Sequence, residues 1–159
     1  MIVISDTTPL HYLVLIGHAG ILPALFGKVV IPAAVASELQ RLRTPEIVRA
    51  WMASPPPWLE TRSVGVSQAG DLDHLGAGER EAILLAEEIG ADWLIVDDYE
   101  GRQEANRRKL PVIGTLRVLD EAAQRQLIDL PEVLAKLKET TFYVSPNLVQ
   151  WLLDRHEKR

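Results

Sequence analysis

Four short apolar runs are the feature of this sequence that most constrains its fold. They occupy residues 2–4, 29–31, 93–96 and 111–113, and they consist mainly of Val, Ile and Leu. Apolar runs of this length, without polar alternation, are typical of strands buried on both faces of a parallel sheet. Since helical patterns separate them, we expect an α/β fold: a three-layer α/β/α sandwich with a central parallel sheet of four to five strands.

Start and stop residues mark the helices between these runs. Thr8 and Pro9 predict a helix start, with Thr8 as the N-cap and Pro9 in the first helical position. Gly90 is a favoured end for the helix expected to begin at Glu79. Residues 59–66 are expected as an edge strand or an irregular connection. Further helices are predicted at residues 19–26, 33–42, 45–53, 100–109, 115–125, 130–138 and 146–156, and a loop at residues 66–78.

Length and composition fit one folded domain over residues 1–159, whose last helix, about residues 146–156, packs on the domain or on a partner. The chain is 47% apolar and 25% charged, which is normal for a protein with a buried core. Without a long apolar run or a secretory pattern, we expect no membrane association and a cytoplasmic location. The net charge of −5 argues against a general nucleic-acid coat protein, but local basic patches still allow a nuclease.

Residue types restrict the kinds of site that the chain can form. The absence of cysteine excludes disulfides, zinc-thiolate sites, iron–sulfur clusters and cysteine nucleophiles. The four histidines, at positions 11, 18, 74 and 156, include no pair at metal-ligand spacing. A bound metal would therefore have oxygen ligands, which favours Mg²⁺ or Mn²⁺ over zinc or copper.

Acidic residues directly follow two of the predicted strands. Asp6 follows the first run, and Asp97 and Asp98 follow residues 93–96. Sites in open α/β sheets form at the carboxyl ends of strands, near the switch in strand order. If the two strands are neighbours, three carboxylates meet at one edge of the sheet. The ordinary alternatives are that Asp6 caps the following helix and that Asp97 and Asp98 are turn residues.

Helix phase adds two glutamates to this set. Glu79 lies within the apolar face of its helix, about 60° from Ala82, whereas Arg80 and Glu81 are predicted to point outward. Glu38 lies at the flank of the apolar stripe of an earlier helix. The ordinary alternatives are that Glu79 stabilises a helix N-terminus and that Glu38 is a common flank residue.

Electrostatics favour a cation in such a cluster. Two like charges about 4 Å apart repel by about 4 kcal/mol at an effective dielectric of about 20, and partial burial costs more. Four or five carboxylates together therefore require a cation among them or protons on some of them. A divalent ion there activates water and neutralises phosphate charge, which indicates phosphodiester hydrolysis.

The order of these acids resembles that of the PIN-domain family, found in metal-dependent ribonucleases. The similarity looks closest to the compact bacterial and archaeal branch and spans roughly residues 1–140. The matching segments are Ile-Ser-Asp6-Thr-Thr-Pro-Leu, Val-Ala-Ser-Glu38-Leu, Gly78-Glu79-Arg80-Glu81-Ala82-Ile83, Ile95-Val96-Asp97-Asp98-Tyr-Glu-Gly101-Arg102 and Val112-Ile113-Gly114-Thr115-Leu116.

This resemblance implies an activity, a metal and partners. It implies cleavage of an RNA substrate by an Mg²⁺- or Mn²⁺-dependent endoribonuclease, in which a metal-bound water attacks phosphorus and the 3′ oxygen leaves. Many PIN proteins are toxins of type II toxin–antitoxin pairs and form homodimers, so a cognate antitoxin and a homodimer are expected. The implied catalytic metal ligands are Asp6, Glu38, Glu79 and Asp97, with Asp98 as a supporting acid.

Three positions depart from the family pattern. Glu79 stands where much of the wider family has Asp, which leaves direct and water-mediated ligation both open. Tyr99 replaces the acid two residues beyond the strand-end Asp, so Asp98 or Glu100 takes that role or the role is absent. Arg117 stands where related sequences often have Gly.

Three further residues are candidate substrate contacts: Arg102, Thr7 and Thr115. Arg102 follows the acidic strand end closely and can contact a substrate phosphate, or it can lie on a solvated helix face. Thr7 and Thr115 can hydrogen-bond ligands or phosphate, or they can serve in strand-end and helix-cap bonding.

Other activities fit the sequence less well. A phosphohydrolase of the haloacid dehalogenase type needs an acid two residues after its nucleophilic Asp, where this chain has Thr8. A receiver domain needs a suitably placed lysine, which we do not find. A non-catalytic PIN-like nucleic-acid-binding or regulatory module is the alternative from a different class.

Overall fold

A computed structural model describes residues 1–65 and 70–157 of the chain. The chain divides into two compact units, Met1–Thr115 and Leu116–Arg159, and each is described by itself. The single domain over residues 1–159 stays a prediction, and residues 66–69 of the predicted loop lie outside the described residues. Within the described ranges, no helix combines the length and the apolar character needed to cross a membrane.

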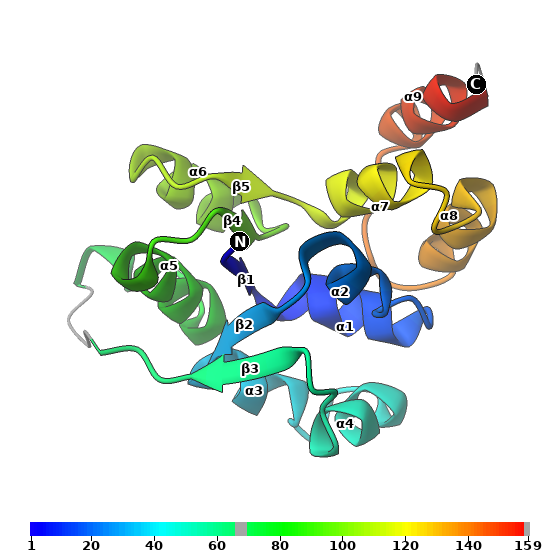
Figure 1. The fold of residues 1–159 in the computed structure, drawn as a ribbon. Helices are drawn as coiled ribbons and strands as arrows, with labels where there is room; N and C mark the ends of the chain where they lie inside the picture. Colours follow the sequence, from blue (N-terminus) through cyan, green and yellow to red (C-terminus); the bar gives the residue numbers. More distant parts are fainter. Residues whose placement is uncertain (66–69, 158–159) are drawn as a thin grey trace. The chain divides into compact units, whose positions relative to one another are not determined.

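The first unit is built around a parallel sheet with strand order β3-β2-β1-β4-β5 (Figure 1). The described residues form five strands in this sheet, and each strand pairs in parallel with its neighbours. The predicted α/β fold is therefore confirmed, and of the two alternatives for residues 59–66 the edge strand is observed over residues 59–62, while residues 63–65 are not strand and residue 66 lies outside the described residues. The strands are β1 (Val3–Ser5), β2 (Val29–Pro32), β3 (Leu59–Arg62), β4 (Trp93–Ile95) and β5 (Val112–Ile113).

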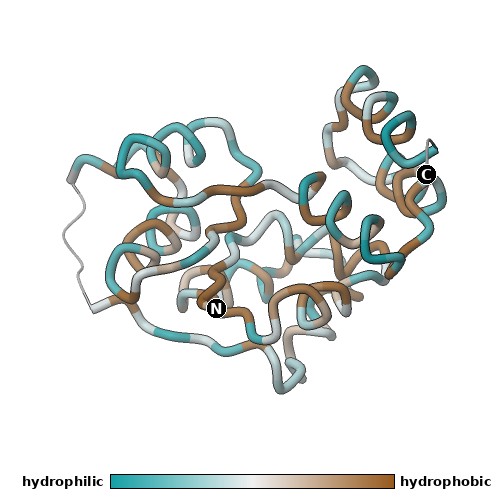
Figure 2. Tube along the Cα trace, turned by 45° about the horizontal axis from the view of Figure 1, so that its top comes forward, coloured by the Kyte–Doolittle hydropathy of each residue, from teal (hydrophilic) through white to brown (hydrophobic). Residues whose placement is uncertain are grey.

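Helices flank this sheet and connect its strands. They are α1 (Thr7–Leu15), α2 (Ile21–Phe26), α3 (Ala33–Leu39), α4 (Glu46–Ala53), α5 (Ala77–Ile89) and α6 (Tyr99–Arg107), with a 3₁₀ turn at Gly70–Leu72. α5 packs against β1, β2, β4 and α3. Ile4, Ile83 and Leu94 are fully buried between these elements, and Figure 2 shows the chain beside the N-terminus as hydrophobic. The predicted buried strands thus form the core.

Helices α1 and α5 each begin two residues earlier than predicted, and α6 begins one residue earlier, at Tyr99. α1 begins at Thr7, and Asp6 rather than Thr8 stands at the N-cap position with an extended backbone. Pro9 still fits, because the first-turn N–H groups of a helix have no intrahelical partner to lose. α5 begins at Ala77, two residues before Glu79, and ends at Gly90 as predicted.

Strand order reverses between β1 and β4. From β1 the chain adds β2 and β3 on one side, and it then crosses to add β4 and β5 on the other. Ser5 pairs with Ile95, and the Asp6 N–H donates to the Ile95 carbonyl at 2.9 Å. Asp6 and Asp97 therefore follow the two strands at the switch point, where open α/β sheets bind ligands.

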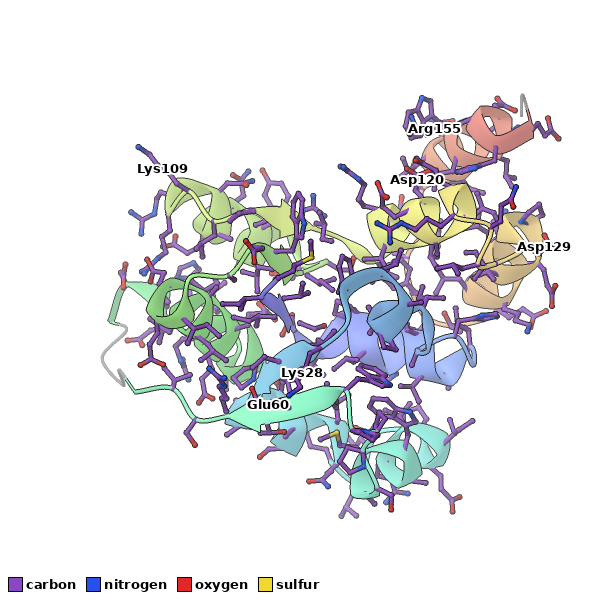
Figure 3. All side chains as sticks on the ribbon, in the orientation of Figure 1. Lys28, Glu60, Lys109, Asp120, Asp129 and Arg155 are labelled. Carbon is purple, nitrogen blue, oxygen red and sulfur yellow. The ribbon has the colours of Figure 1, made fainter. Side chains whose placement is uncertain are left out.

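The second unit contains three described helices, which are α7 (Thr115–Gln124, beginning at the last residue of the first unit), α8 (Leu130–Lys138) and α9 (Pro146–Glu157). α9 packs against α8 and buries Val149 and Leu152. Asp120 on α7 is buried, with its Oδ1 2.7 Å from His156 Nε2 and 3.4 Å from Arg155 Nε (Figure 3). An apolar contact and a buried carboxylate thus hold α9 within this unit.

Candidate functional site

Asp6 is the most buried acid at the switch point. It is 2% exposed, and its side chain makes no capping hydrogen bond to α1, so helix capping does not explain it. Burial raises the pKa of Asp6 to about 7, against the opposing effect of the Thr7 amide. The negative charges that raise this pKa further are those of Glu38, Asp97 and Asp98. Asp6 therefore lies among the other candidate acids.

Glu79 lies in the first turn of α5 and is about half buried. Burial is the largest cause that raises its pKa, which reaches about 8. The charges of Asp6 and Asp98, a hydrogen bond with Asp98 and the charge of Glu38 act in the same direction. The structure thus brings Glu79 together with the strand-end acids rather than leaving it as a simple helix N-terminal charge.

Glu38 reaches this group from α3. The Thr7 hydroxyl donates to Glu38 Oε2 at 3.2 Å. Gly78 of α5 lies directly against the same carboxylate, because a Cβ at this position would be 2.8 Å from Glu38 Oε1 and 2.9 Å from Thr7 Oγ1. A side chain at this position would force the Glu38 carboxylate or the Thr7 hydroxyl to shift. The Thr7 hydroxyl and the close approach of α5 therefore hold Glu38 where its charge raises the pKa of Asp6.

Asp97 is held on both of its carboxylate oxygens by Thr115. The Thr115 amide donates to Oδ1 at 2.8 Å, and the Thr115 hydroxyl donates to Oδ2 at 2.6 Å. Burial raises the pKa of Asp97, while these two bonds and the charge of Arg102 lower it. The Asp97 carboxylate is thus fixed in orientation, and Thr115 acts on it directly.

Asp98 is more exposed and serves as the N-cap of α6. Its Oδ2 accepts from the Gly101 amide at 3.0 Å, so part of the turn-residue alternative is observed. Its charge nevertheless raises the pKa of both Asp6 and Glu79. Asp98 therefore contributes negative potential to the site while its side chain caps a helix.

Arg102 lies beside Asp97. A Cβ on Gly114 would be 2.6 Å from Arg102 Nη1 and 3.0 Å from Asp97 Oδ1, so the glycine makes room for both side chains. By contrast, Arg107, the last residue of α6, and Arg108, which follows it, bind Glu104 and take part in an ion-pair network. Arg102 is thus the α6 arginine that the structure places at the candidate site.

The donors at this site fit a divalent cation in chemical type. All are carboxylates, the hard oxygen ligands that Mg²⁺ and Mn²⁺ prefer, and burial together with neighbouring negative charges raises the pKa of both Asp6 and Glu79. Across residues 1–65 and 70–157, no group of three or more Asp, Glu or His side chains is already arranged to hold a metal. Coordination would therefore require these carboxylates to move together around the ion, against their mutual repulsion.

Sequence reasoning missed Glu81, which was predicted to point outward. The Ala34 amide of α3 donates to Glu81 Oε1 at 3.0 Å, so this prediction was wrong. The sequence does contain one indication that Glu81 faces a neighbouring helix: its i,i+3 spacing from Gly78 places both residues on one face of α5. A glycine in the first turn of a helix commonly has a packing reason, and here that reason is α3.

A pocket at the opposite end of the sheet contains none of the candidate residues. It is lined by residues 1–3 at the start of β1, by residues in or next to β2 and β3 and by the end of α5, among them Lys28 and Glu60, which Figure 3 labels. The candidate site therefore consists of the carboxylates and their partners at the carboxyl ends of β1 and β4.

Comparisons with known proteins agree with this fold. The chain is similar in structure to a PilT N-terminus domain protein from the hyperthermophilic archaeon Sulfolobus solfataricus P2, with a TM-score of 0.51 and 19% identity over 91% of this chain and 100% of that chain. No curated protein matches the chain in sequence. The family model described as DUF3368, PIN domain, matches residues 2–158. Because this match covers almost the whole sequence, the chain belongs to the PIN-domain family.

Proposed function

We propose that this protein is a Mg²⁺- or Mn²⁺-dependent endoribonuclease that hydrolyses RNA phosphodiester bonds. One observation carries the proposal: at the β1/β4 switch point, burial and mutual repulsion raise the pKa of Asp6 to about 7 and that of Glu79 to about 8. PIN domains are generally nucleases and typically use divalent metals, which supports the same conclusion.

Several carboxylates are proposed to bind the ion together, and neighbouring residues support them. Asp98 supports them through its charge, and Thr7 and Thr115 orient Glu38 and Asp97 through their hydroxyl groups. A divalent ion at this position supplies an activated water and neutralises charge on the phosphate. The residues proposed to hold it are Asp6, Glu38, Glu79 and Asp97.

An RNA substrate needs positive charge beside this acidic site. Arg102 is one candidate, and the loop after Glu38 supplies two more, Arg41 and Arg43. Both are exposed, and within the described part of the chain neither forms an ion pair. The Thr44 hydroxyl donates to the Glu38 carbonyl at 3.0 Å, which holds this loop against α3. We assign contacts with the RNA backbone to these arginines.

A toxin role, a cognate antitoxin partner and a homodimer belong to the same proposal, and they rest on the family resemblance alone. The carboxylates argue against the non-catalytic alternative. Burying acids whose charges repel costs stability, and a metal-dependent nuclease gives these acids a function.

Cleavage of a synthetic RNA oligonucleotide tests the proposed activity. Wild-type protein is expected to cleave RNA with Mn²⁺ or Mg²⁺ and to stop when EDTA is added. Asp6→Asn is expected to be inactive, and Asp73→Asn, which changes an exposed acid outside the site, is expected to cleave as the wild type does. Cleavage by Asp6→Asn, or cleavage in EDTA, would contradict the proposal, as would a protein that cleaves only DNA.

A further inference from the structure

We propose that Glu81 is a positioning residue that fixes Glu38 in the acidic site, an inference that rests on the proposed metal-binding function. One hydrogen bond suggests it: the Ala34 amide, in the first turn of α3, donates to Glu81 Oε1 at 3.0 Å. Glu81 belongs to α5, and Glu38 belongs to α3. The bond therefore joins the two helices that carry the non-strand acids of the site.

The start of α3 needs such a partner. This helix has seven residues, about two turns, and helices of this length are marginal on their own. Its N-cap position is occupied by Pro32, which provides no side-chain hydrogen bond to the first-turn amides. Glu81 supplies the missing acceptor from a neighbouring helix, and its negative charge suits a helix N-terminus.

Two contacts, one helical turn apart, lock α3 against α5. Gly78 and Glu81 lie on one face of α5, and Ala34 and Glu38 lie on one face of α3. Glu81 binds Ala34, while Gly78 lies against the Glu38 carboxylate. The buried side chains of Val35 and Leu39 hold α3 in the core, and these two contacts set its rotation and its position along α5.

The consequence for Glu38 follows from its place on α3. Glu38 lies one turn beyond Ala34, so a movement of the helix start carries the Glu38 carboxylate with it. The Thr7 hydroxyl donates to this carboxylate at 3.2 Å, so Glu38 is held both at its carboxylate and through its helix. Glu81 therefore acts on the site through the backbone of α3 and does not itself touch an ion or substrate.

Two variants separate this role from a simple effect of charge. Glu81→Gln removes the charge but keeps an amide oxygen that accepts from Ala34, whereas Glu81→Ala removes both. Glu88→Ala is the matched control, because Glu88 lies on the same helix and its Oε1 accepts from the Gly65 amide at 3.0 Å, away from α3. Mn²⁺ affinity is measured by calorimetry, and exchange of the Ala34 amide is measured by NMR.

Glu81→Ala is expected to bind Mn²⁺ about tenfold more weakly than the wild type, the usual effect of losing an outer-shell partner, and to exchange the Ala34 amide faster. Glu81→Gln and Glu88→Ala are expected to stay within about twofold of the wild-type dissociation constant. Both variants remove the charge of Glu81, so wild-type affinity in Glu81→Gln together with weaker binding in Glu81→Ala cannot result from the loss of charge alone.

Each other outcome is decisive. Equal loss in Glu81→Gln and Glu81→Ala would show an effect of charge and overturn the positioning role. Wild-type affinity in Glu81→Ala would overturn it while leaving the metal site standing, and a wild-type protein that binds no Mn²⁺ would overturn the proposed function together with it. If thermal unfolding shows that Glu81→Ala does not fold, Glu81→Gln carries the test, and a loss of affinity above about twofold in that variant overturns the proposal.

Discussion

Thr115 donates to both carboxylate oxygens of Asp97, through its amide at 2.8 Å and through its hydroxyl at 2.6 Å. Thr115 is the first residue of α7, so Asp97 accepts from an amide that has no partner within its own helix. The same contact therefore satisfies a helix start and orients a proposed ligand. Such partners of metal ligands fix the direction in which the ligand can bind.

Thr115→Val removes the hydroxyl donor while keeping the shape of the side chain. We expect Mn²⁺ affinity to fall about tenfold, because Asp97 loses one of its two orienting bonds. Thr115→Ser keeps the hydroxyl and is expected to bind within about twofold of the wild type. Calorimetry measures both, and equal affinity in the Val variant and the wild type would refute the orienting role.

Gly78→Ala tests the close approach of α5 to Glu38. The added Cβ would lie 2.8 Å from Glu38 Oε1 and would push the carboxylate away from Asp6. We expect Mn²⁺ affinity to fall by about tenfold or more. Gly76→Ala is the control, since its Cβ would meet Glu79 Oε1 at an ordinary 3.5 Å. Calorimetry of the two variants decides the matter: similar affinities would mean that the position of Glu38 is unimportant.

Asp6→Asn is expected to stabilise the metal-free protein at pH 8. The pKa of Asp6 rises on folding from 3.8 to about 7, so between these pH values the folded state binds more protons than the unfolded state. The free energy of unfolding therefore falls as pH rises through this interval, and it is lowest once Asp6 is ionised. An asparagine does not ionise and so does not lose this stability. We expect the melting temperature of Asp6→Asn to be roughly 3 to 8 °C above that of the wild type at pH 8.

Thermal unfolding in EDTA at pH 5 and pH 8 measures this effect. The gain is expected to be clearly smaller at pH 5, where Asp6 is protonated in the folded wild type. A variant that is less stable than the wild type at pH 8 would show that the Asp6 charge is compensated in the metal-free protein.

Arg41 and Arg43 are expected to act on RNA binding and not on the chemical step. The double variant to Ala should raise KM for RNA several-fold while kcat stays within about twofold, because uniform binding energy is lost. The dependence of KM on salt should also weaken, since contacts with phosphate are removed. Steady-state cleavage kinetics measure these values, with Arg62→Ala as the control, because Arg62 is exposed and pairs with Glu60. A fall in kcat at unchanged KM would contradict the assignment.

The strand-end acids were predictable from local sequence. Asp6 and Asp97 follow apolar runs, and strands buried on both faces end where polar residues begin. That β1 and β4 are neighbours was left as a condition, because strand order depends on long-range pairing that a single sequence does not display. The start of α1 was missed for a related reason: Thr8 and Pro9 suit a helix start, but Pro9 fits equally well inside the first turn.

The contacts of Glu81 and Thr115 could not be predicted from the local sequence, because they depend on how separate elements pack together. The angle of Glu81 on its helix was measured from the apolar face of α5, and this angle carries no information about a second helix beside that face. The bond from Ala34 depends on how α3 lies against α5. Thr115 was left between ligand contact and helix capping, and only the position of Asp97 shows that one contact serves the helix start and the acid together.

Calorimetric titration of the wild-type protein with Mn²⁺ at pH 6, 7 and 8 tests the central claim most directly. Because Asp6 and Glu79 have pKa values of about 7 and about 8, both hold protons at pH 6, and Mn²⁺ must displace them. The account predicts Mn²⁺ binding that tightens from pH 6 to pH 8, by up to about tenfold per displaced proton and pH unit, with release of more than one proton at pH 7. Absence of Mn²⁺ binding, or binding that neither releases protons nor changes with pH, would contradict it.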